Sequence, residues 1–152
     1  MTDEEYNKVK LENKRLLDSS LKDKNFINIP TKCKEEEIIL SDDSGNLFRL
    51  ILENGRRKNK YKFQIMSKNN SIILCRIDTS GPDHYNPGSD IPVPYPHIHI
   101  YKQGFRDSFA YTLESLDEFS GCENECSMLK NLLNYFNVNN VGRIINSNPR
   151  IF

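Results

Sequence analysis

The chain has 152 residues, of which 37% are hydrophobic and 28% are charged. This length suits one domain, and eight Phe and seven Tyr among many Ile and Leu suffice for a core, which excludes full disorder. Lys plus Arg and Asp plus Glu both number 21, so no overall field draws the chain to nucleic acid or to a membrane surface. The sequence holds no long apolar run and no signal-peptide pattern, so we predict a cytoplasmic protein without a membrane partner.

A helix is predicted at the start of the chain, over residues 3–24 within an N-terminal segment 1–26. Thr2 or Asp3 can cap it, and acidic residues occupy the first turn, where the helix dipole favours them. The apolar residues fit a stripe of helical period, which predicts packing on the body of the domain through Tyr6, Val9, Leu16, Leu17 and Leu21.

Short runs of β-branched and aromatic residues follow, separated by turn signals such as Asn54-Gly55. They predict about six strands, over 38–41, 47–53, 61–67, 71–79, 97–102 and 109–113. Short connections favour an antiparallel sheet spanning 36–114. A loop rich in Pro and Gly, 81–96, interrupts the sheet.

A second helix is predicted within 120–138, where Leu129, Leu132, Leu133 and Phe136 form a stripe of helical spacing. The fold class is therefore α+β: an N-terminal helix, a curved antiparallel sheet of about six strands and a C-terminal helix packed on the sheet. We expect one domain over 1–152, as a monomer or small homo-oligomer, because both helices can be satisfied within one chain.

All three histidines lie between residues 84 and 99. Strict alternation in the run from His97 to Tyr101 predicts that His97, His99 and Tyr101 share one face of a strand, opposite Ile98 and Ile100. In the preceding strand, Arg76 and Asp78 are also two residues apart, and the proline-rich loop can fold His84 and Asn86 over the same surface.

Three interpretations of this segment remain open. In the first, the protein binds zinc. His97 and His99 on the strand supply two ligands, and His84 or else Asp78 supplies the third. Without a metal, one imidazole can act as base and another as acid in phosphodiester cleavage, with Arg76 neutralising the phosphate. Alternatively, the histidines only hydrogen-bond to Asp78 and to loop carbonyls and hold the loop in place. We expect no cofactor, with zinc as the weaker alternative.

A basic segment lies at a predicted hairpin and contains five cations with one aromatic: Arg56, Arg57, Lys58, Lys60 and Lys62 around Tyr61. Such a positive finger can hold a phosphate backbone or an acidic groove of a partner protein, and a charged turn that only keeps the hairpin soluble is equally common.

The four cysteines are expected to be free thiols, because nothing in the sequence directs the chain to an oxidising compartment. Cys122 and Cys126 have the spacing C-x-x-x-C, which is half of a zinc site at most. Walker, dinucleotide-binding, serine-hydrolase and H-E-x-x-H motifs are absent, which disfavours those activities.

The middle of the chain resembles a family of small uncharacterised bacterial and phage proteins. The resemblance rests on R-x-D-x-x-G-P-x-H-x-N-P from Arg76, on P-H-x-H-x-Y from Pro96, on Gly104-Phe105 and on the ending 132–138. It covers about 47–150. Such proteins are carried by phages and other mobile elements, so the resemblance implies a role in toxin–antitoxin systems, defence or counter-defence.

These observations leave two hypotheses and no decision on whether the protein is an enzyme. In the first, the protein acts on RNA as a small metal-independent ribonuclease of toxin or defence type. His97 and His99 share acid–base work there with His84 as a third candidate, Asp78 orients an imidazole, Tyr101 contacts a base or phosphate, and the basic finger with Asn86 binds the substrate. In the second, the protein is a non-enzymatic phage inhibitor or adaptor, of anti-CRISPR kind, that binds a nucleic-acid-handling complex of the host.

Overall fold

The structure is a computed structural model that describes residues 1–17, 26–57 and 59–146. Within these residues the helices are α1 (Asp3–Leu11) and α2 (Glu125–Tyr135), with single 3-10 turns η2 (Leu113–Ser115) and η3 (Asp117–Phe119). The strands are β1 (Lys14–Leu16), β2 (Phe26–Ile29), β3 (Glu35–Asp42), β4 (Leu47–Asn54), β5 (Tyr61–Ser67), β6 (Ile73–Asp78), β7 (His97–Ile100), β8 (Ala110–Thr112) and β9 (Arg143–Asn146).

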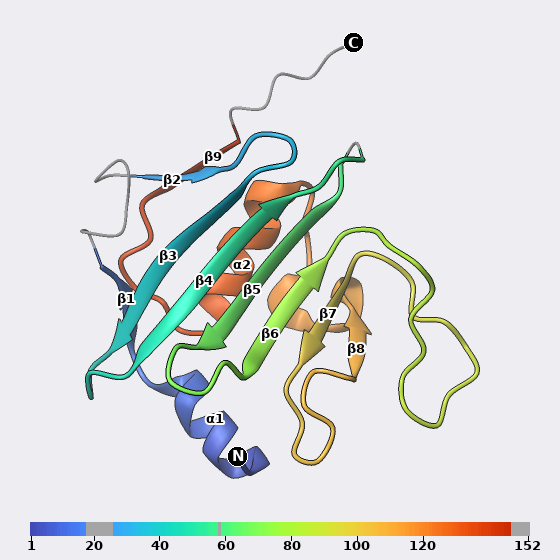
Figure 1. The fold of residues 1–152 in the computed structure, drawn as a ribbon, viewed down its shortest axis with the longest axis horizontal. Coiled ribbons are helices and arrows are strands. Elements are labelled where there is room, and N and C mark those ends of the chain that lie inside the picture. The colour runs from blue at the N-terminus through green and yellow to red at the C-terminus, as the bar shows by residue number, and fades with distance from the viewer. Residues whose placement is uncertain (18–25, 58, 147–152) are drawn as a thin grey trace.

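Seven strands form one sheet in the order β1-β3-β4-β5-β6-β7-β8, and every neighbouring pair is antiparallel (Figure 1). From β3 onward this is a meander, since each strand pairs with the next along the chain. β2 and β9 form a separate parallel pair. The predicted α+β class is confirmed: along the chain, one helix precedes the antiparallel sheet and another follows it.

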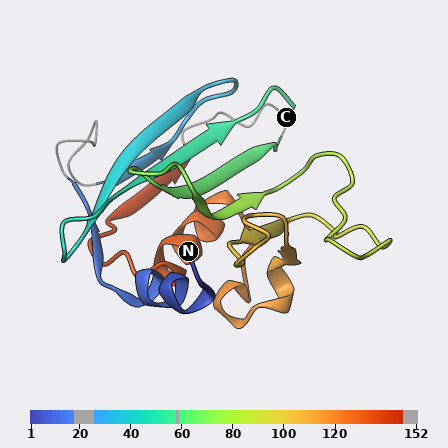
Figure 2. The same cartoon turned by 60° about the horizontal axis from the view of Figure 1, so that its bottom comes forward.

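One face of the sheet carries the core. Figure 2 shows α1, α2 and the 3-10 turns on the same side of the sheet. The apolar stripe of α2 is fully buried there, as its spacing predicts, against the inward side chains of the central strands such as Phe63 and Leu50. Among the described residues, none of the helices is long and apolar enough to cross a bilayer.

The N-terminal helix is shorter than the sequence predicts. A capping box formed by Thr2 and Glu5 starts α1, but the helix ends at Leu11. Residues 14–16 form β1 and pair with β3, with Leu16 opposite Leu40. The prediction of a helix through residue 17 is therefore wrong, because strand pairing overrides an apolar spacing that suits a helix and a strand alike. The rest of the predicted helix, residues 18–24, lies outside the described part of the chain.

A buried lysine joins both helices to the sheet. Lys14 is only 2% exposed, and its Nζ donates to the backbone oxygens of Lys10 (3.2 Å), Glu12 (2.7 Å) and Phe136 (2.8 Å). The ammonium also lies 4.1 Å from the ring centroid of Phe136. Burial lowers the pKa of Lys14 to about 8, so the side chain still carries its charge at neutral pH. It thereby satisfies carbonyls near the ends of α1 and α2 that have no helical partner.

We expect Lys14→Ala to lower the free energy of unfolding by about 2–4 kcal/mol, because it leaves buried carbonyls unpaired and opens a cavity beside Phe136. Urea denaturation followed by circular dichroism measures this change. Lys8→Ala, at an exposed position of α1, is the matched control and should change the value by less than about 0.5 kcal/mol. Equal effects of the two substitutions would contradict the structural role of Lys14.

Candidate functional site

The site lies on the outer face of the sheet, where β6 and β7 pair. The register sets Arg76 opposite His99 and Asp78 opposite His97, so the predicted side chains share one face. The loop 81–96 and the segment before β8 cover this end of the sheet, and His97 and His99 are only 0% and 3% exposed. Polar groups buried so completely need partners within the protein.

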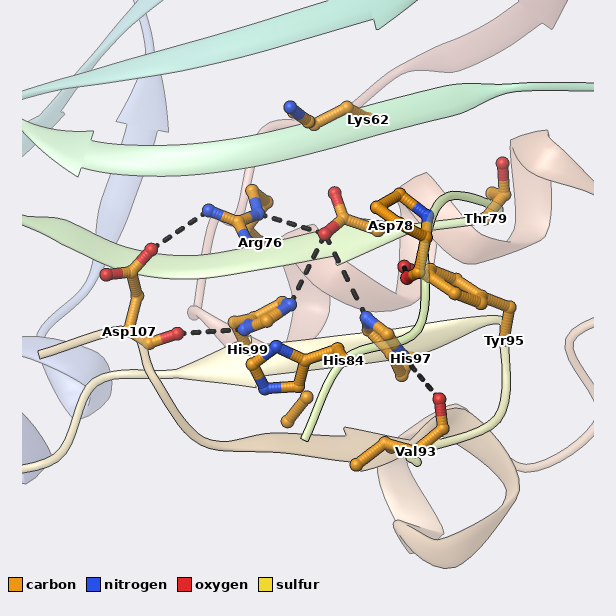
Figure 3. Close-up of polar contacts among 12 residues, drawn as sticks. Lys62, Arg76, Asp78, Thr79, His84, Val93, Tyr95, His97, His99 and Asp107 are labelled. Atoms are coloured by element: carbon orange, nitrogen blue, oxygen red, sulfur yellow. Dashed lines mark hydrogen bonds and ion pairs between the residues drawn. The ribbon is translucent and has the colours of Figure 1, made fainter. Parts of the chain in front are cut away.

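The carboxylate of Asp78 is the centre of the cluster (Figure 3). Its Oδ2 accepts a hydrogen bond from Nε of Arg76 at 3.1 Å and lies 3.3 Å from Nε2 of His99 and 4.0 Å from Nε2 of His97. Burial pushes the pKa of Asp78 upward, but the contact with His99 and the positive charge of Arg76 outweigh it, and the net shift is downward. Asp78 is therefore ionised at neutral pH.

The opposite nitrogen of each buried imidazole contacts a backbone carbonyl. Nδ1 of His97 lies 3.2 Å from the oxygen of Val93, and Nδ1 of His99 lies 2.8 Å from that of Asp107. Because a carbonyl can only accept, each Nδ1 carries a hydrogen. Burial and the neighbouring His99 lower the pKa of His97, and its ring is therefore neutral at pH 7 with a lone pair on Nε2.

His84 and Asn86 fix the loop to the chain that leads into β8. Nε2 of His84 lies 2.9 Å from the carbonyl oxygen of Ser108. The amide of Asn86 bonds to Ala110 twice, donating to its oxygen and accepting from its nitrogen, each at 2.8 Å. The ring of His84 also contacts that of His99, with centroids 4.7 Å apart. The structure thus brings the loop histidine beside the histidines of β7.

One predicted residue, Tyr101, lies away from the predicted face, and another, Arg76, has partners that the sequence pattern does not show. Tyr101 does not join the histidines, because β7 ends at Ile100 and the alternation stops; its ring packs in the core against Tyr6 and its hydroxyl donates to the backbone oxygen of Met1. Arg76 lies on the predicted face, where its Nε donates to Asp78 and its Nη1 donates to Asp107 at 2.9 Å. Its guanidinium mainly neutralises these two carboxylates.

The basic finger and the histidine site line the same cleft, which has a volume of about 500 Å³. Arg56 and Arg57 lie exposed in the β4–β5 turn, and Lys62 pairs loosely with Glu53 at 3.9 Å. Lys58 lies outside the described residues. Basic residues outnumber acidic ones in the described lining, which also includes Lys60, Arg76, Asp78, Asp83, His84, Tyr95 and His99.

Metal-ligating atoms converge at one place in the described chain. One side-chain atom each from Asp78, His97 and His99 lies within 4.8 Å of the other two, and His84 is not in this group. The four thiols are free, with Cys122 and Cys126 half-buried.

Sequence reasoning missed Asp107, which supports Arg76, and Tyr95, whose ring stacks on His97 with centroids 4.1 Å apart. Neither belongs to a recognisable spacing. Only the proximity of Tyr95 to His97 in the sequence points toward such a contact.

We expect Asn86→Ala to loosen the loop, because it removes both hydrogen bonds to the backbone of Ala110. The free energy of unfolding should fall by about 1–3 kcal/mol, and the amide of Ala110 should lose protection against hydrogen exchange. Asn69→Ala, at an exposed turn position, should change neither quantity. Unchanged protection of Ala110 in Asn86→Ala would show that Asn86 does not hold the loop.

A family model matches residues 1–138, and its description is a family of unknown function, DUF6978. No curated protein and no solved structure matches the chain. The matched range contains the whole seven-stranded sheet, α2 and the described cleft, and it ends before β9. The expectation of an uncharacterised family is confirmed: the chain belongs to the family of unknown function DUF6978.

Proposed function

We propose that the protein binds RNA in the cleft through the phosphate backbone and cleaves a phosphodiester bond there. One observation carries this proposal: the basic finger and the histidine site, which are separate in the sequence, line one cleft. Its volume of about 500 Å³ lies within the range of about 300–1,000 Å³ that is typical of ligand sites.

The rim of the cleft supplies binding without base recognition. Arg56 and Arg57 are exposed, and no carboxylate of the described residues forms an ion pair with either. Their charges are thus available to phosphate oxygens, which accept from guanidinium groups in pairs of hydrogen bonds. Balanced charge over the whole chain means that this attraction is local, so a single strand entering the cleft is favoured over binding across the whole surface.

His84 is the histidine best placed for proton transfer. It lines the cleft, and its Nδ1 makes no hydrogen bond with the described residues, whereas both ring nitrogens of His99 face protein oxygens and His97 is covered by Tyr95. In the proposed reaction the imidazole takes the proton of a ribose 2′-hydroxyl while O2′ bonds to phosphorus. The P–O5′ bond breaks, and the imidazolium returns the proton to O5′.

A ribonuclease of this kind fits a toxin or defence factor carried by a mobile element, which is the role that the resemblance of the motif implies. Cleavage of host or phage RNA would be its effect in the cell.

We expect Arg56→Glu/Arg57→Glu to weaken binding of a short single-stranded RNA about tenfold or more at low salt, because two attractive charges beside the phosphates become repulsive. Fluorescence anisotropy over a salt series gives the association constant K at each salt concentration. The slope of log K against log salt should be less steep than that of the wild type by about 0.7 for each phosphate that the variant no longer neutralises. Lys8→Glu/Lys130→Glu makes the same charge change on exposed parts of α1 and α2 and should leave binding near the wild-type value. Equal losses of affinity in both double variants would contradict binding in the cleft.

We expect His84→Gln to reduce the rate of RNA cleavage by about 10²–10⁴-fold while RNA affinity stays the same. Glutamine can keep a donor near the oxygen of Ser108, so the loop keeps its anchor but loses its titratable group. The assay follows an end-labelled RNA beside a DNA of the same sequence, which lacks the 2′-hydroxyl and should stay intact. An undiminished rate in His84→Gln would remove His84 from the mechanism.

A second function is favoured by the outer surface of the loop. Ile91 and Tyr85 are 71% and 49% exposed on a segment that prolines and the Asn86 contacts hold in place. Exposed apolar side chains on a rigid support are typical of protein–protein contacts. In this case the protein is an inhibitor or adaptor of a nucleic-acid-handling complex. Co-elution with such a complex in gel filtration, lost in Ile91→Asp and retained in His84→Gln, would support this function over catalysis.

A further inference from the structure

We propose that Asp78, His97 and His99 form a binding site for one divalent transition-metal ion, of the class that includes Zn²⁺ and Co²⁺. The site is formed by these three side chains and their immediate neighbours. Binding of the ion does not depend on the proposed function; only the role of the ion in RNA cleavage rests on it.

The hydrogen positions on the two imidazoles direct both lone pairs toward the carboxylate. Because both Nδ1 atoms donate to carbonyl oxygens, a neutral ring in either position has its lone pair on Nε2. Both Nε2 atoms face Oδ2 of Asp78, at 4.0 Å from His97 and 3.3 Å from His99. Three electron-pair donors therefore converge beside the guanidinium of Arg76, whose Nε donates to Oδ2 of Asp78.

A hydrogen bond between His99 and Asp78 alone would leave Nε2 of His97 without a partner. That atom is buried and has no protein partner, as is the case for Oδ1 of Asp78, and such atoms are positions where an ion or an ordered water can bind.

A metal ion accounts for all three groups. Two ligands that each lie about 2.0–2.1 Å from a tetrahedral ion are about 3.3 Å apart, which matches His99 and Asp78. Nε2 of His97 lies farther away, at 4.0 Å from Oδ2 of Asp78, and would have to move toward the ion to complete the set. Two imidazoles with one carboxylate suit transition ions, whereas Mg²⁺ and Ca²⁺ prefer oxygen ligands alone.

The proposed ligands are themselves held by hydrogen bonds to neighbouring groups, as metal ligands in proteins usually are. Ligand histidines usually donate their other ring nitrogen to a carbonyl or carboxylate, as His97 and His99 do to Val93 and Asp107. Arg76 holds the carboxylate of Asp78 in place. Asp78 and His99 line the cleft while Tyr95 stacks over His97, so an open coordination position would face the cleft. An ion there would stabilise negative charge on a bound phosphate.

The first test uses the wild-type full chain, freed of metal with a chelator. Isothermal titration with Zn²⁺ should show one ion per chain with micromolar or tighter affinity, and Mg²⁺ should give no binding. Co²⁺ should produce visible absorption bands without a thiolate-to-cobalt charge-transfer band. A strong charge-transfer band would place the ion on cysteine and overturn the proposal, as would the absence of Zn²⁺ binding.

The second test uses His97→Asn/His99→Asn. Asparagine keeps an N–H in the position of Nδ1 and so retains the bonds to Val93 and Asp107, but it lacks Nε2. Zn²⁺ affinity should fall by more than the roughly 10–100-fold that removal of a supporting group costs. His84→Gln and Cys122→Ser/Cys126→Ser are the matched controls and should bind as the wild type does. A double asparagine variant with a native circular dichroism spectrum and unchanged affinity would overturn the proposal.

These outcomes separate the ion from the RNA. Protein that binds RNA but takes up no Zn²⁺ overturns the metal site alone. Protein that takes up Zn²⁺ but neither binds nor cleaves RNA overturns the proposed function alone.

Discussion

Burying a carboxylate under a loop costs several kcal/mol of folding free energy unless neighbouring groups compensate its charge. This requirement determines the contacts at one end of the sheet. The side chain of Asp78 is only 13% exposed. Its neutralising partner, Arg76, also binds Asp107, which lies just ahead of β8. The backbone oxygen of Asp107 in turn accepts from His99. The contacts around one charge thus connect β6, β7 and the chain leading into β8.

A network that only held the loop would satisfy its own polar atoms. Most of this network does so, as the paired bonds of Asn86 show. Two buried atoms of the described residues are exceptions, Oδ1 of Asp78 and Nε2 of His97, and both lie where the histidines meet the carboxylate. Buried polar atoms without a protein partner are positions where water or a ligand can bind, and the proposed metal ion would occupy this one. Rigid surroundings also serve a site, because ligand groups fixed in advance lose little entropy on binding.

Much of the sheet can be predicted because alternation and turn residues are local signals. The strand predicted over 61–67 has those bounds in the structure, and the one over 47–53 is short by a single residue. The predicted N-terminal helix is too long because the apolar spacing at Leu16 suits either structure, and its partner Leu40 is distant in sequence. In the site, side chains with characteristic spacing such as His97 and His99 are predictable. The carbonyls that orient them are not, since any residue can supply one.

The contacts of Lys14 also determine when the parts of the chain can assemble. Its backbone nitrogen and oxygen bond to Asn137 and Asn139, and its ammonium binds the oxygen of Phe136, which is 122 positions away along the chain. Hairpins β3–β4 and β4–β5 close over short turns, whereas this contact requires nearly the whole polypeptide. The contacts of Lys14 with residues 136–139 can therefore form only after almost the whole chain has been synthesised, later than the contacts within these hairpins.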